Sequence, residues 1–388
     1  MAMKSAVDHV LSQAVNSQAV PGVIAIAATD REIIYDGAFG KRALGHDAAM
    51  TLDTTVWIAS MTKAITGAAA MHLVEQGKLQ LDTPAADVVP DLAKAQVLTG
   101  FDASDKPQLR APKRPITLRH LQTHTAGFSY DMWNADMVKY QKVTGTPSLL
   151  TCKNAALTTP LMFDPGDRWE YGINIDWIGK MVEAVSGQKL GQYLQQHLFA
   201  PLGMNDTSFK VTSDQQARLA GMHQRQPDGS LAVIPFGMPQ EPEFEMGGGG
   251  LCGTAHDYIR FTRMILNGGT LDGTRVLKPE TVRMMSHNQV GDINCAPMKT
   301  VIPTSSHDAD FFPGMKQKWG FSFLINTEQS PQGRSAGSLA WAGLGNTYYW
   351  IDPVKQVTGV LFTQILPFFD PKAISLFRAF ETAVYQSL

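Results

Sequence analysis

A serine and a lysine stand three residues apart in a run of small and apolar residues that spans positions 58–71. This spacing places Ser60 and Lys63 on one face at the start of a helix, which the pattern predicts to end near Gly77. Because burial disfavours the ammonium form, a lysine inside such a helix has a lowered pKa and can accept a proton from a neighbouring hydroxyl. Ser60 and Lys63 are therefore a candidate nucleophile and its base.

The start of this helix offers a second chemical feature. Backbone N–H groups in a first helical turn are unpaired and carry the positive end of the helix dipole, so the Ser60 amide can bind an oxyanion. By itself a Ser-x-x-Lys pair is weak evidence, because it occurs by chance in many proteins. The alternative interpretation is an N-cap serine followed by a lysine that faces solvent.

Composition narrows the class of protein. The 388 residues include 33 basic and 35 acidic side chains, which give a formal net charge of −2, and 44% of residues are hydrophobic. The sequence has no broad basic character, so nucleic acid and anionic membrane are poor candidates for partners. Three cysteines without a CxxC pair are compatible with a reducing compartment. The N-terminus lacks a secretory apolar run, and we expect a soluble cytoplasmic protein; the oligomeric state stays open.

Strand patterns gather at the two ends of the chain. The runs are 23–28 and 33–40 near the amino end, then 319–325, 338–343, 347–352 and 358–364, with helices expected over 4–17 and 371–387. The region between them has mostly helical patterns and loops. The sequence thus predicts an α+β fold, with one antiparallel sheet built from both termini and flanked by helices, plus a mostly helical inserted domain.

The same pattern suggests where the domains meet. We expect residues 1–60 and 245–388 to form the α/β domain and residues 61–244 to form the helical domain. Ser60 and Lys63 then lie at the interface between them. A doubly wound parallel sheet is disfavoured, because strands do not alternate strictly with helices and no Gly-x-Gly-x-x-Gly follows a strand.

Ser60-Met61-Thr62-Lys63 resembles the nucleophile motif of the serine β-lactamase and penicillin-binding-protein superfamily. Four further segments resemble the same superfamily in the same order, namely residues 116–128, 163–171, 201–207 and 247–251. The resemblance extends from about residue 5 to the carboxy terminus. It implies a β-lactamase-like fold and acyl transfer through a covalent intermediate.

Two other motifs of the superfamily are altered. Tyr171 keeps the tyrosine of the Tyr-x-Asn motif found in class C β-lactamases, but the asparagine stands one residue late, at Asn174. The Lys-Thr-Gly motif is replaced by residues 341–343, Trp-Ala-Gly, which removes the lysine and threonine that engage a β-lactam carboxylate. The glycine still allows close backbone approach. This combination is similar to the β-lactamase-like carboxylesterases often called family VIII esterases.

The resemblance implies a set of site residues. Catalytic roles are implied for Ser60, Lys63 and Tyr171, an oxyanion site for the Ser60 and Leu344 amides, and substrate binding for Trp341, Gly343 and Tyr130, the last at the pocket rim. The implied substrate is a small short-acyl or aryl ester, hydrolysed through a Ser60 acyl-enzyme, with acyl transfer to alcohols as an additional activity. The alternatives are a class C-like β-lactamase or D-alanyl peptidase, and a sensor that is acylated without turnover.

Other motifs are better explained by structure than by chemistry. His120 and His124 are four residues apart, as in a zinc pair, but no third ligand accompanies them, so we expect structural hydrogen bonds and no metal. The glycines at 247–250 lack the Gly-Lys-Ser/Thr ending of a phosphate loop, which favours a close-packed turn beside the active site and no cofactor. Trp341 is also compatible with plain packing within a strand.

Overall fold

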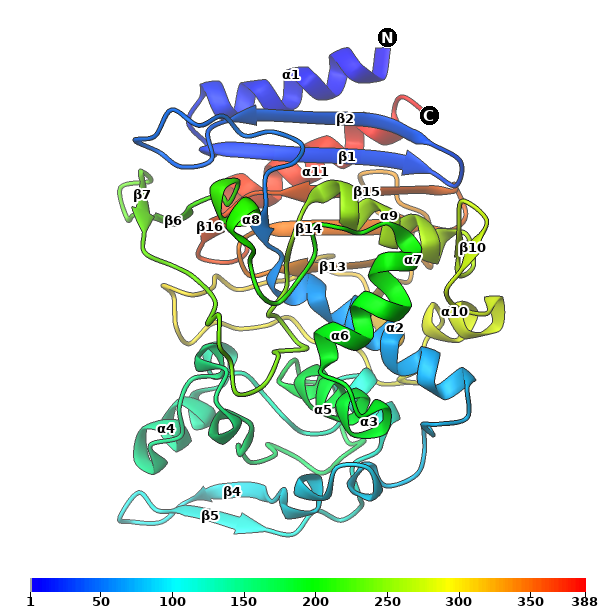
Figure 1. The fold of residues 1–388 in the computed structure, drawn as a ribbon. Coiled ribbons are helices and arrows are strands. Elements are labelled where there is room, and N and C mark those ends of the chain that lie inside the picture. Colours follow the sequence, from blue (N-terminus) through cyan, green and yellow to red (C-terminus); the bar gives the residue numbers. More distant parts are fainter. Residues whose placement is uncertain (1) are drawn as a thin grey trace.

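The computed structural model describes residues 2–388 and contains a seven-stranded antiparallel sheet that draws on both ends of the chain (Figure 1). Its order is β11-β12-β13-β14-β15-β1-β2. The strands are β1 Gly22–Thr29, β2 Ile33–Gly40, β11 Gln317–Trp319, β12 Leu324–Asn326, β13 Leu339–Gly343, β14 Thr347–Asp352 and β15 Val357–Phe362. The predicted α+β fold with a sheet from both termini is confirmed.

Strands from the two ends of the chain meet inside the sheet, where β1 pairs with β15. Ile24 stands opposite Phe362, and Ala28 opposite Thr358, in antiparallel register. β1 is buried along nearly its whole length, which explains its continuous run of apolar residues.

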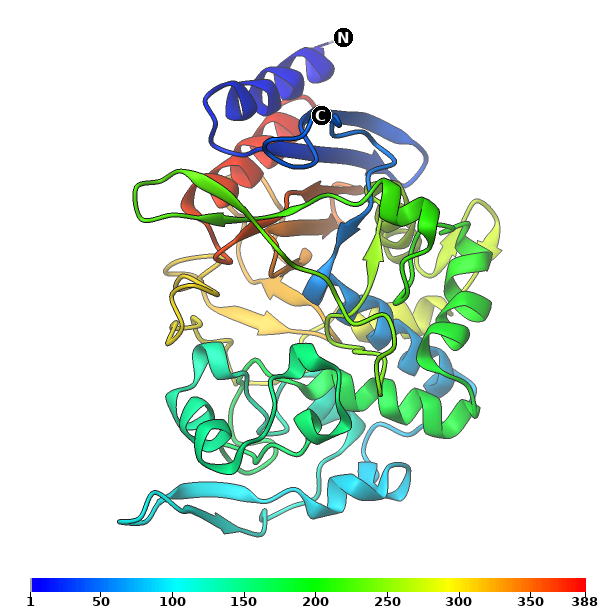
Figure 2. The same ribbon diagram turned by 60° about the vertical axis from the view of Figure 1, so that its left-hand side comes forward.

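Helices cover both faces of this sheet. On one face α1 (Ala2–Asn16) and α11 (Pro371–Tyr385) pack against each other, and in Figures 1 and 2 they lie side by side near the two termini. On the other face α9 (Ala255–Leu266) packs against β1, β14 and β15. Neighbouring residues of β14 point to opposite faces, so Tyr349 contacts Tyr258 of α9 while Trp350 contacts Phe377 of α11.

The single strand expected over residues 319–325 is wrong, because two strands share this segment. Residues 319–325 form the end of β11, a tight turn and the start of β12, because the Gly320 amide donates to the Phe323 carbonyl oxygen. A side chain at Gly320 would overlap the Met285 carbonyl oxygen. The apolar residues Phe321 and Phe323 are buried as the run suggests, but burial alone does not distinguish a strand from a buried turn.

The middle of the chain supplies the rest of the molecule. Its central helix is α2 (Thr62–Glu75), which packs against α5 (Asn174–Ser186). The other helices are α3 Leu118–Gln122, α4 Ala135–Thr144, α6 Leu190–Leu194, α7 Ala200–Leu202, α8 Ser213–Ala217 and α10 Pro279–Met285. The hairpin of β4 (Val97–Phe101) and β5 (Pro107–Arg110) lies at the end of the molecule away from the termini in both views (Figures 1 and 2). None of the helices in residues 2–388 is long and apolar enough to cross a membrane.

Short strand pairs tie these parts together. They are β3 Val56–Trp57 with β8 Cys252–Gly253, β6 Met222–Arg225 with β7 Leu231–Ile234 and β16 Ile365–Leu366, and β9 Thr270–Leu271 with β10 Thr274–Arg275. The β3 and β8 pair matters most for the site, because the chain passes directly from β3 into the turn that holds Ser60.

Candidate active site

Ser60 lies in a 3₁₀ turn, Ala59–Met61, immediately before α2. Ala59 has a φ of 47°, a left-handed conformation that a residue with a Cβ rarely adopts. Such strain at the residue before a candidate nucleophile indicates that the surrounding structure holds the turn in place. The Ser60 amide belongs to the first turn, where N–H groups have no partner within the helix.

Strand β13 approaches this turn at Gly343. A Cβ at Gly343 would overlap the carbonyl oxygen of Ile58, so the close approach requires glycine. The next residue, Leu344, lines the same cavity as Ser60. The contact between β13 and the turn thus places Ser60 and Leu344 at one cavity, and the binding of an oxyanion by their amides stays a prediction.

Lys63 is completely buried and makes three hydrogen bonds. Its Nζ donates to Ser60 Oγ at 3.1 Å, to the Tyr130 hydroxyl at 2.9 Å and to the Gly248 carbonyl oxygen at 2.5 Å. Burial lowers the pKa of Lys63, and the charge of Asp176 opposes that shift only in part. A lysine in this environment can exist in the neutral form that accepts a proton from Ser60.

Tyr171 is buried beside Ser60 and Trp341. Its hydroxyl accepts a hydrogen bond from Trp341 Nε1 at 2.9 Å. Burial raises the pKa of Tyr171, while the contacts with Ser60 and Trp341 work in the opposite direction. The phenol therefore stays protonated at neutral pH and is suited to donating a proton.

The three residues expected to bind substrate, Tyr130, Trp341 and Gly343, have other contacts. Tyr130 was expected at the pocket rim, but its hydroxyl accepts from Lys63 and only its remaining surface lines the cavity. Within the described part of the chain, Trp341 and Gly343 do not line the cavity beside Ser60. Trp341 instead points its indole N–H at Tyr171, and Gly343 packs on Ile58. The hydroxyl that meets Lys63 is thus that of Tyr130, and the one beside Ser60 is that of Tyr171.

Asp176 is a site residue that sequence reasoning missed. It lies in the first turn of α5 and is fully buried, and its Oδ1 accepts from the Gly248 amide at 2.8 Å. The Gly248 carbonyl oxygen in turn accepts from Lys63, so the backbone of this one residue connects the aspartate to the lysine. Burial raises the pKa of Asp176, and Lys63 opposes that rise. The available signal was a single charged residue among the mostly apolar residues 173–179.

The glycines at 247–250 form the predicted close-packed turn rather than a phosphate cradle. A Cβ at Gly248 would lie 2.5 Å from Asp176 Oδ2, which is closer than such atoms approach. We expect Gly248→Ala to lower the free energy of unfolding by about 1–3 kcal/mol, because the buried aspartate has no room to move away. Thermal unfolding measures the effect. Gly237→Ala is the matched control, since a Cβ there meets nothing within 4 Å, and equal melting temperatures for the two variants would contradict this contact.

The displaced asparagine and the two histidines have structural roles. Asn174 Nδ2 lies 2.9 Å from His124 Nδ1, which also accepts from the Gly172 amide at 3.4 Å. His120 Nδ1 accepts from the Thr117 amide at 3.3 Å and completes the cap of α3. Within residues 2–388, no three His, Cys, Asp or Glu side chains are placed to hold a metal ion.

A small apolar cavity of about 110 Å³ opens beside Ser60. Its walls are mainly aromatic and aliphatic and include Trp57, Met132, Trp133, Leu149, Leu150, Met246 and Ile302. Asp131 is the one charged residue among the described residues that line it, and burial raises the pKa of that carboxyl group. The cavity is therefore suited to an uncharged, apolar group attached to the carbon that Ser60 attacks.

Comparison with known proteins decides the family. A family model described as Beta-lactamase matches residues 7–381. The chain belongs to the beta-lactamase family. Within it, the chain is 32% identical over 391 residues to monacolin J acid methylbutanoyltransferase of Aspergillus terreus, which covers 96% of this chain and 93% of that protein. It is also 32% identical over 399 residues to lovastatin esterase of Penicillium rubens, with 98% of each chain covered.

Solved structures of this beta-lactamase family agree with the sequence comparison. Unliganded simvastatin synthase (LovD) from Aspergillus terreus superimposes with a TM-score of 0.85 at 29% identity, covering 100% of this chain and 99% of the other. The two curated relatives are named as a methylbutanoyltransferase and an esterase. This member of the beta-lactamase family is accordingly a serine hydrolase.

Proposed function

We propose that the protein is a carboxylesterase that acts on small, uncharged short-acyl or aryl esters through a Ser60 acyl-enzyme and passes the acyl group to water or to an alcohol. The observation that carries this proposal is the charge of the cavity beside Ser60. Its one charged lining residue among those described is the acidic Asp131, and Trp341 stands where a β-lactamase has the lysine of Lys-Thr-Gly. A substrate carboxylate near the scissile bond would therefore meet repulsion instead of a cation.

Acylation begins with Ser60. Neutral Lys63, with its Nζ 3.1 Å from Ser60 Oγ, accepts the hydroxyl proton as the oxygen attacks the ester carbonyl. The Ser60 and Leu344 amides hold the oxyanion, and one such donor contributes about 10²–10³ in rate. Tyr171 gives its proton to the leaving alkoxide and regains one from Lys63, so the serine proton ends on the released alcohol.

Deacylation reverses these roles. Water or an alcohol attacks the acyl carbonyl, its proton passes to the base, and the Ser60 oxygen leaves with a proton. Both acceptors use the same steps, so hydrolysis and acyl transfer compete at one site. That competition agrees with relatives named as an esterase and as acyltransferases.

The size of the cavity supports a short acyl group. At about 110 Å³ it is well below the range of roughly 300–1,000 Å³ that drug-sized ligands occupy. One relative is named a methylbutanoyltransferase, and a short branched acyl group of that kind suits this volume. We expect activity to fall as the acyl chain of a p-nitrophenyl ester grows beyond butanoyl.

A time course distinguishes the candidate activities. We expect sustained turnover of p-nitrophenyl butyrate, little turnover of nitrocefin, and formation of a butyrate ester when a small alcohol is added. Nitrocefin turnover faster than ester turnover would show a β-lactamase. A single stoichiometric burst with both reagents would show a protein that is acylated without turnover.

The contact between Trp341 and Tyr171 gives a prediction about rate. Trp341→Phe removes the indole N–H while keeping an aromatic ring, so Tyr171 loses one bond that stabilises its ionised form. We expect kcat for p-nitrophenyl butyrate to fall about tenfold, the loss of one hydrogen bond of about 1.4 kcal/mol, with KM little changed. Trp319→Phe serves as a matched control, because that indole donates to the Gln122 carbonyl oxygen instead. Equal kcat values for the wild type and Trp341→Phe would contradict this role.

The charge of Asp131 gives a prediction about specificity. Asp131→Asn removes the negative charge from the cavity without changing its shape. We expect kcat/KM for p-nitrophenyl hemisuccinate, an anionic ester, to rise several-fold relative to that for p-nitrophenyl butyrate, as removal of about 1 kcal/mol of repulsion requires. An unchanged ratio between the two esters would show that Asp131 has no part in substrate choice.

A further inference from the structure

His124 contacts the chain on both sides of Tyr171. Its carbonyl oxygen accepts from the Glu170 amide at 2.9 Å, and its imidazole Nδ1 accepts from the Gly172 amide at 3.4 Å. The imidazole ring also packs on the Tyr171 ring, with the two ring centroids 4.8 Å apart. One residue thus binds the amides of both neighbours of Tyr171 and contacts its side chain.

The backbone of His124 is itself held in an uncommon conformation. Its φ of 55° lies in the left-handed region, which few residues with a Cβ adopt, although histidine does so more often than most. The residue is fully buried just after α3, and its amide donates to the Leu121 carbonyl oxygen at 3.3 Å. Backbone strain persists only where the surrounding structure fixes it, and it is concentrated at functional sites.

Asn174, the asparagine displaced from the Tyr-x-Asn position, fixes the state of this imidazole. It is fully buried and offers no surface to a substrate, and its Nδ2 lies 2.9 Å from His124 Nδ1. Because the Gly172 amide can only donate, Nδ1 carries a lone pair and the imidazole proton lies on Nε2. Burial, and then the charge of Lys63, hold the pKa of His124 well below its usual range, so the ring stays neutral.

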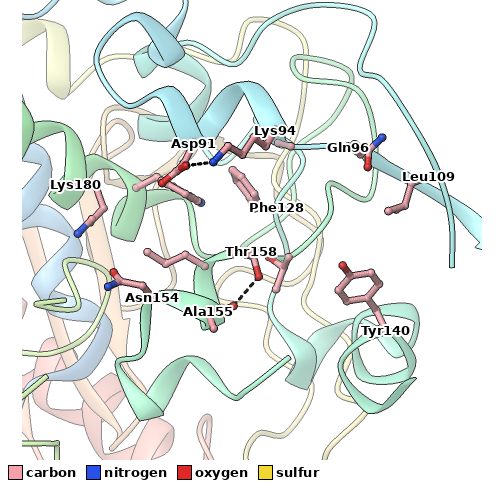
Figure 3. Close-up of a pocket in the computed structure, with 14 residues that line it drawn as sticks. Asp91, Lys94, Gln96, Leu109, Phe128, Tyr140, Asn154, Ala155, Thr158 and Lys180 are labelled. Atoms are coloured by element: carbon pink, nitrogen blue, oxygen red, sulfur yellow. Dashed lines mark hydrogen bonds and ion pairs between the residues drawn. The ribbon is translucent and has the colours of Figure 1, made fainter. Parts of the chain in front are cut away.

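A second contact of this segment is steric only. A Cβ at Gly172 would overlap the Phe128 carbonyl oxygen. The ring of the same Phe128 lines a cavity of about 520 Å³, where Figure 3 shows it close to the ion pair of Asp91 and Lys94. Steric contact excludes positions, whereas a hydrogen bond constrains both distance and angle. The orientation of residues 170–172 therefore depends on His124 more than on Phe128.

We infer that His124 is a positioning residue for Tyr171, and that Asn174 holds His124 in the tautomer that binds the Gly172 amide. The two backbone hydrogen bonds fix the chain from which the phenol extends, and the imidazole ring limits its tilt, so the hydroxyl stays beside Ser60. Such support matters because a displacement of about 1 Å can lower a rate by about 10²-fold. This role rests on the proposed function of Tyr171 as the proton donor in acyl transfer.

Two replacements of His124 test which part of the side chain matters. His124→Asn places an amide oxygen near the position of Nδ1, whereas His124→Gln carries its amide farther out, near Nε2. Both residue types tolerate the left-handed backbone, which Gln18 and Gln356 adopt elsewhere in this chain. We expect kcat for p-nitrophenyl butyrate to fall about 10²-fold in His124→Gln and less than about tenfold in His124→Asn, with KM within about twofold in both.

The order of these two variants is the decisive readout. Glutamine is closer to histidine in size, so a residue that only fills space would retain more activity as His124→Gln than as His124→Asn. That reverse order, or an equal loss of kcat in the two variants, would overturn the inference.

His223→Gln is the matched control for lost stability. His223 is also buried, and its Nε2 accepts from a backbone amide, that of Leu44, at 3.1 Å. We expect His223→Gln to lower the melting temperature as His124→Gln does, and to leave kcat within about threefold of the wild type. An equal fall in kcat would show that lost stability, and not the position of Tyr171, lowers the rate.

The pH–rate profile separates positioning from proton transfer by His124 itself. The ionisable groups beside the imidazole are Lys63 and Tyr171, and its other ring neighbours, Trp169 and Trp319, carry no charge. We expect His124→Asn to keep the rise in rate with pH that belongs to Lys63, at a lower plateau. Loss of a titration step in this variant would show that His124 exchanges a proton, which would overturn a positioning role.

A measurement without substrate keeps this inference apart from the proposed function. In protein with ¹⁵N-labelled histidine, NMR should show His124 protonated on Nε2 and not on Nδ1 at neutral pH. Asn174→Leu, which removes the second donor, should let the Nδ1-protonated form appear, and an unchanged tautomer would overturn the role of Asn174. A wild-type His124 protonated on Nδ1 would overturn the inference, whereas the expected tautomer without any ester turnover would contradict the proposed function alone.

Discussion

Ser60→Ala is expected to lower kcat/KM for p-nitrophenyl butyrate by at least about 10⁴-fold, because it removes the proposed nucleophile and leaves only binding and the oxyanion donors. The change is small in volume and lies in a 3₁₀ turn that backbone contacts hold, so the fold should persist. Steady-state kinetics with a matched thermal unfolding curve measure both quantities.

Ser148→Ala is the control for this variant. Ser148 lines the same cavity as Ser60 but makes no contact with Lys63 among the described contacts. We expect its kcat/KM to stay within about threefold of the wild type, the range typical of a lost exposed contact. Loss of activity in Ser148→Ala together with normal activity in Ser60→Ala would place the nucleophile elsewhere.

Lys63→Met is expected to lower kcat by about 10²–10⁴-fold, the usual contribution of a positioned general base. Only neutral Lys63 accepts the Ser60 proton, so the wild-type rate should rise with pH through the lowered pKa of this lysine and then level. The residual rate of Lys63→Met should not show this rise with pH. The pH–rate profiles of the two proteins measure it, and the same step in both would contradict the role of Lys63 as base.

The pH dependence of stability gives a check on Lys63 that does not involve catalysis. Its folded-state pKa is lowered by burial, so between that value and about 10.4 the unfolded chain binds more protons than the folded chain. The wild type should therefore gain stability as pH rises through this interval, and Lys63→Met should lack that contribution. Lys63→Arg should not restore activity, because a guanidinium stays protonated.

Much of the fold follows from local sequence patterns. Alternating and continuous apolar runs with turn residues between them predict β1, β2, β13, β14 and β15, and the helical period predicts α1 and α11. The sheet that they form from both termini is confirmed. The division of the chain near residues 60 and 245 stays a prediction. The β11–β12 turn could not be predicted, because Phe321 and Phe323 are buried by tertiary contacts and not by strand pairing.

The candidate site, like the fold, was predicted from the sequence only in part. Ser60, Lys63 and Tyr171 are found by motif and spacing, and the structure brings all three together. The partners of these residues were not foreseeable, because Trp341 reaches Tyr171 across 170 positions in the sequence. Tyr130 reaches Lys63 across 67 positions, and Asp176 reaches Gly248 across 72. Sequence spacing locates groups within one element, whereas these hydrogen bonds depend on how separate elements pack.

The most direct test of acyl transfer through Ser60 is mass spectrometry of the protein after brief exposure to p-nitrophenyl butyrate and an acid quench. We predict one butanoyl group on the wild-type chain, located at Ser60 within the tryptic peptide of residues 43–63, and none on Ser60→Ala. A butanoyl group on another residue, or equal acylation of Ser60→Ala, would contradict acyl transfer through Ser60.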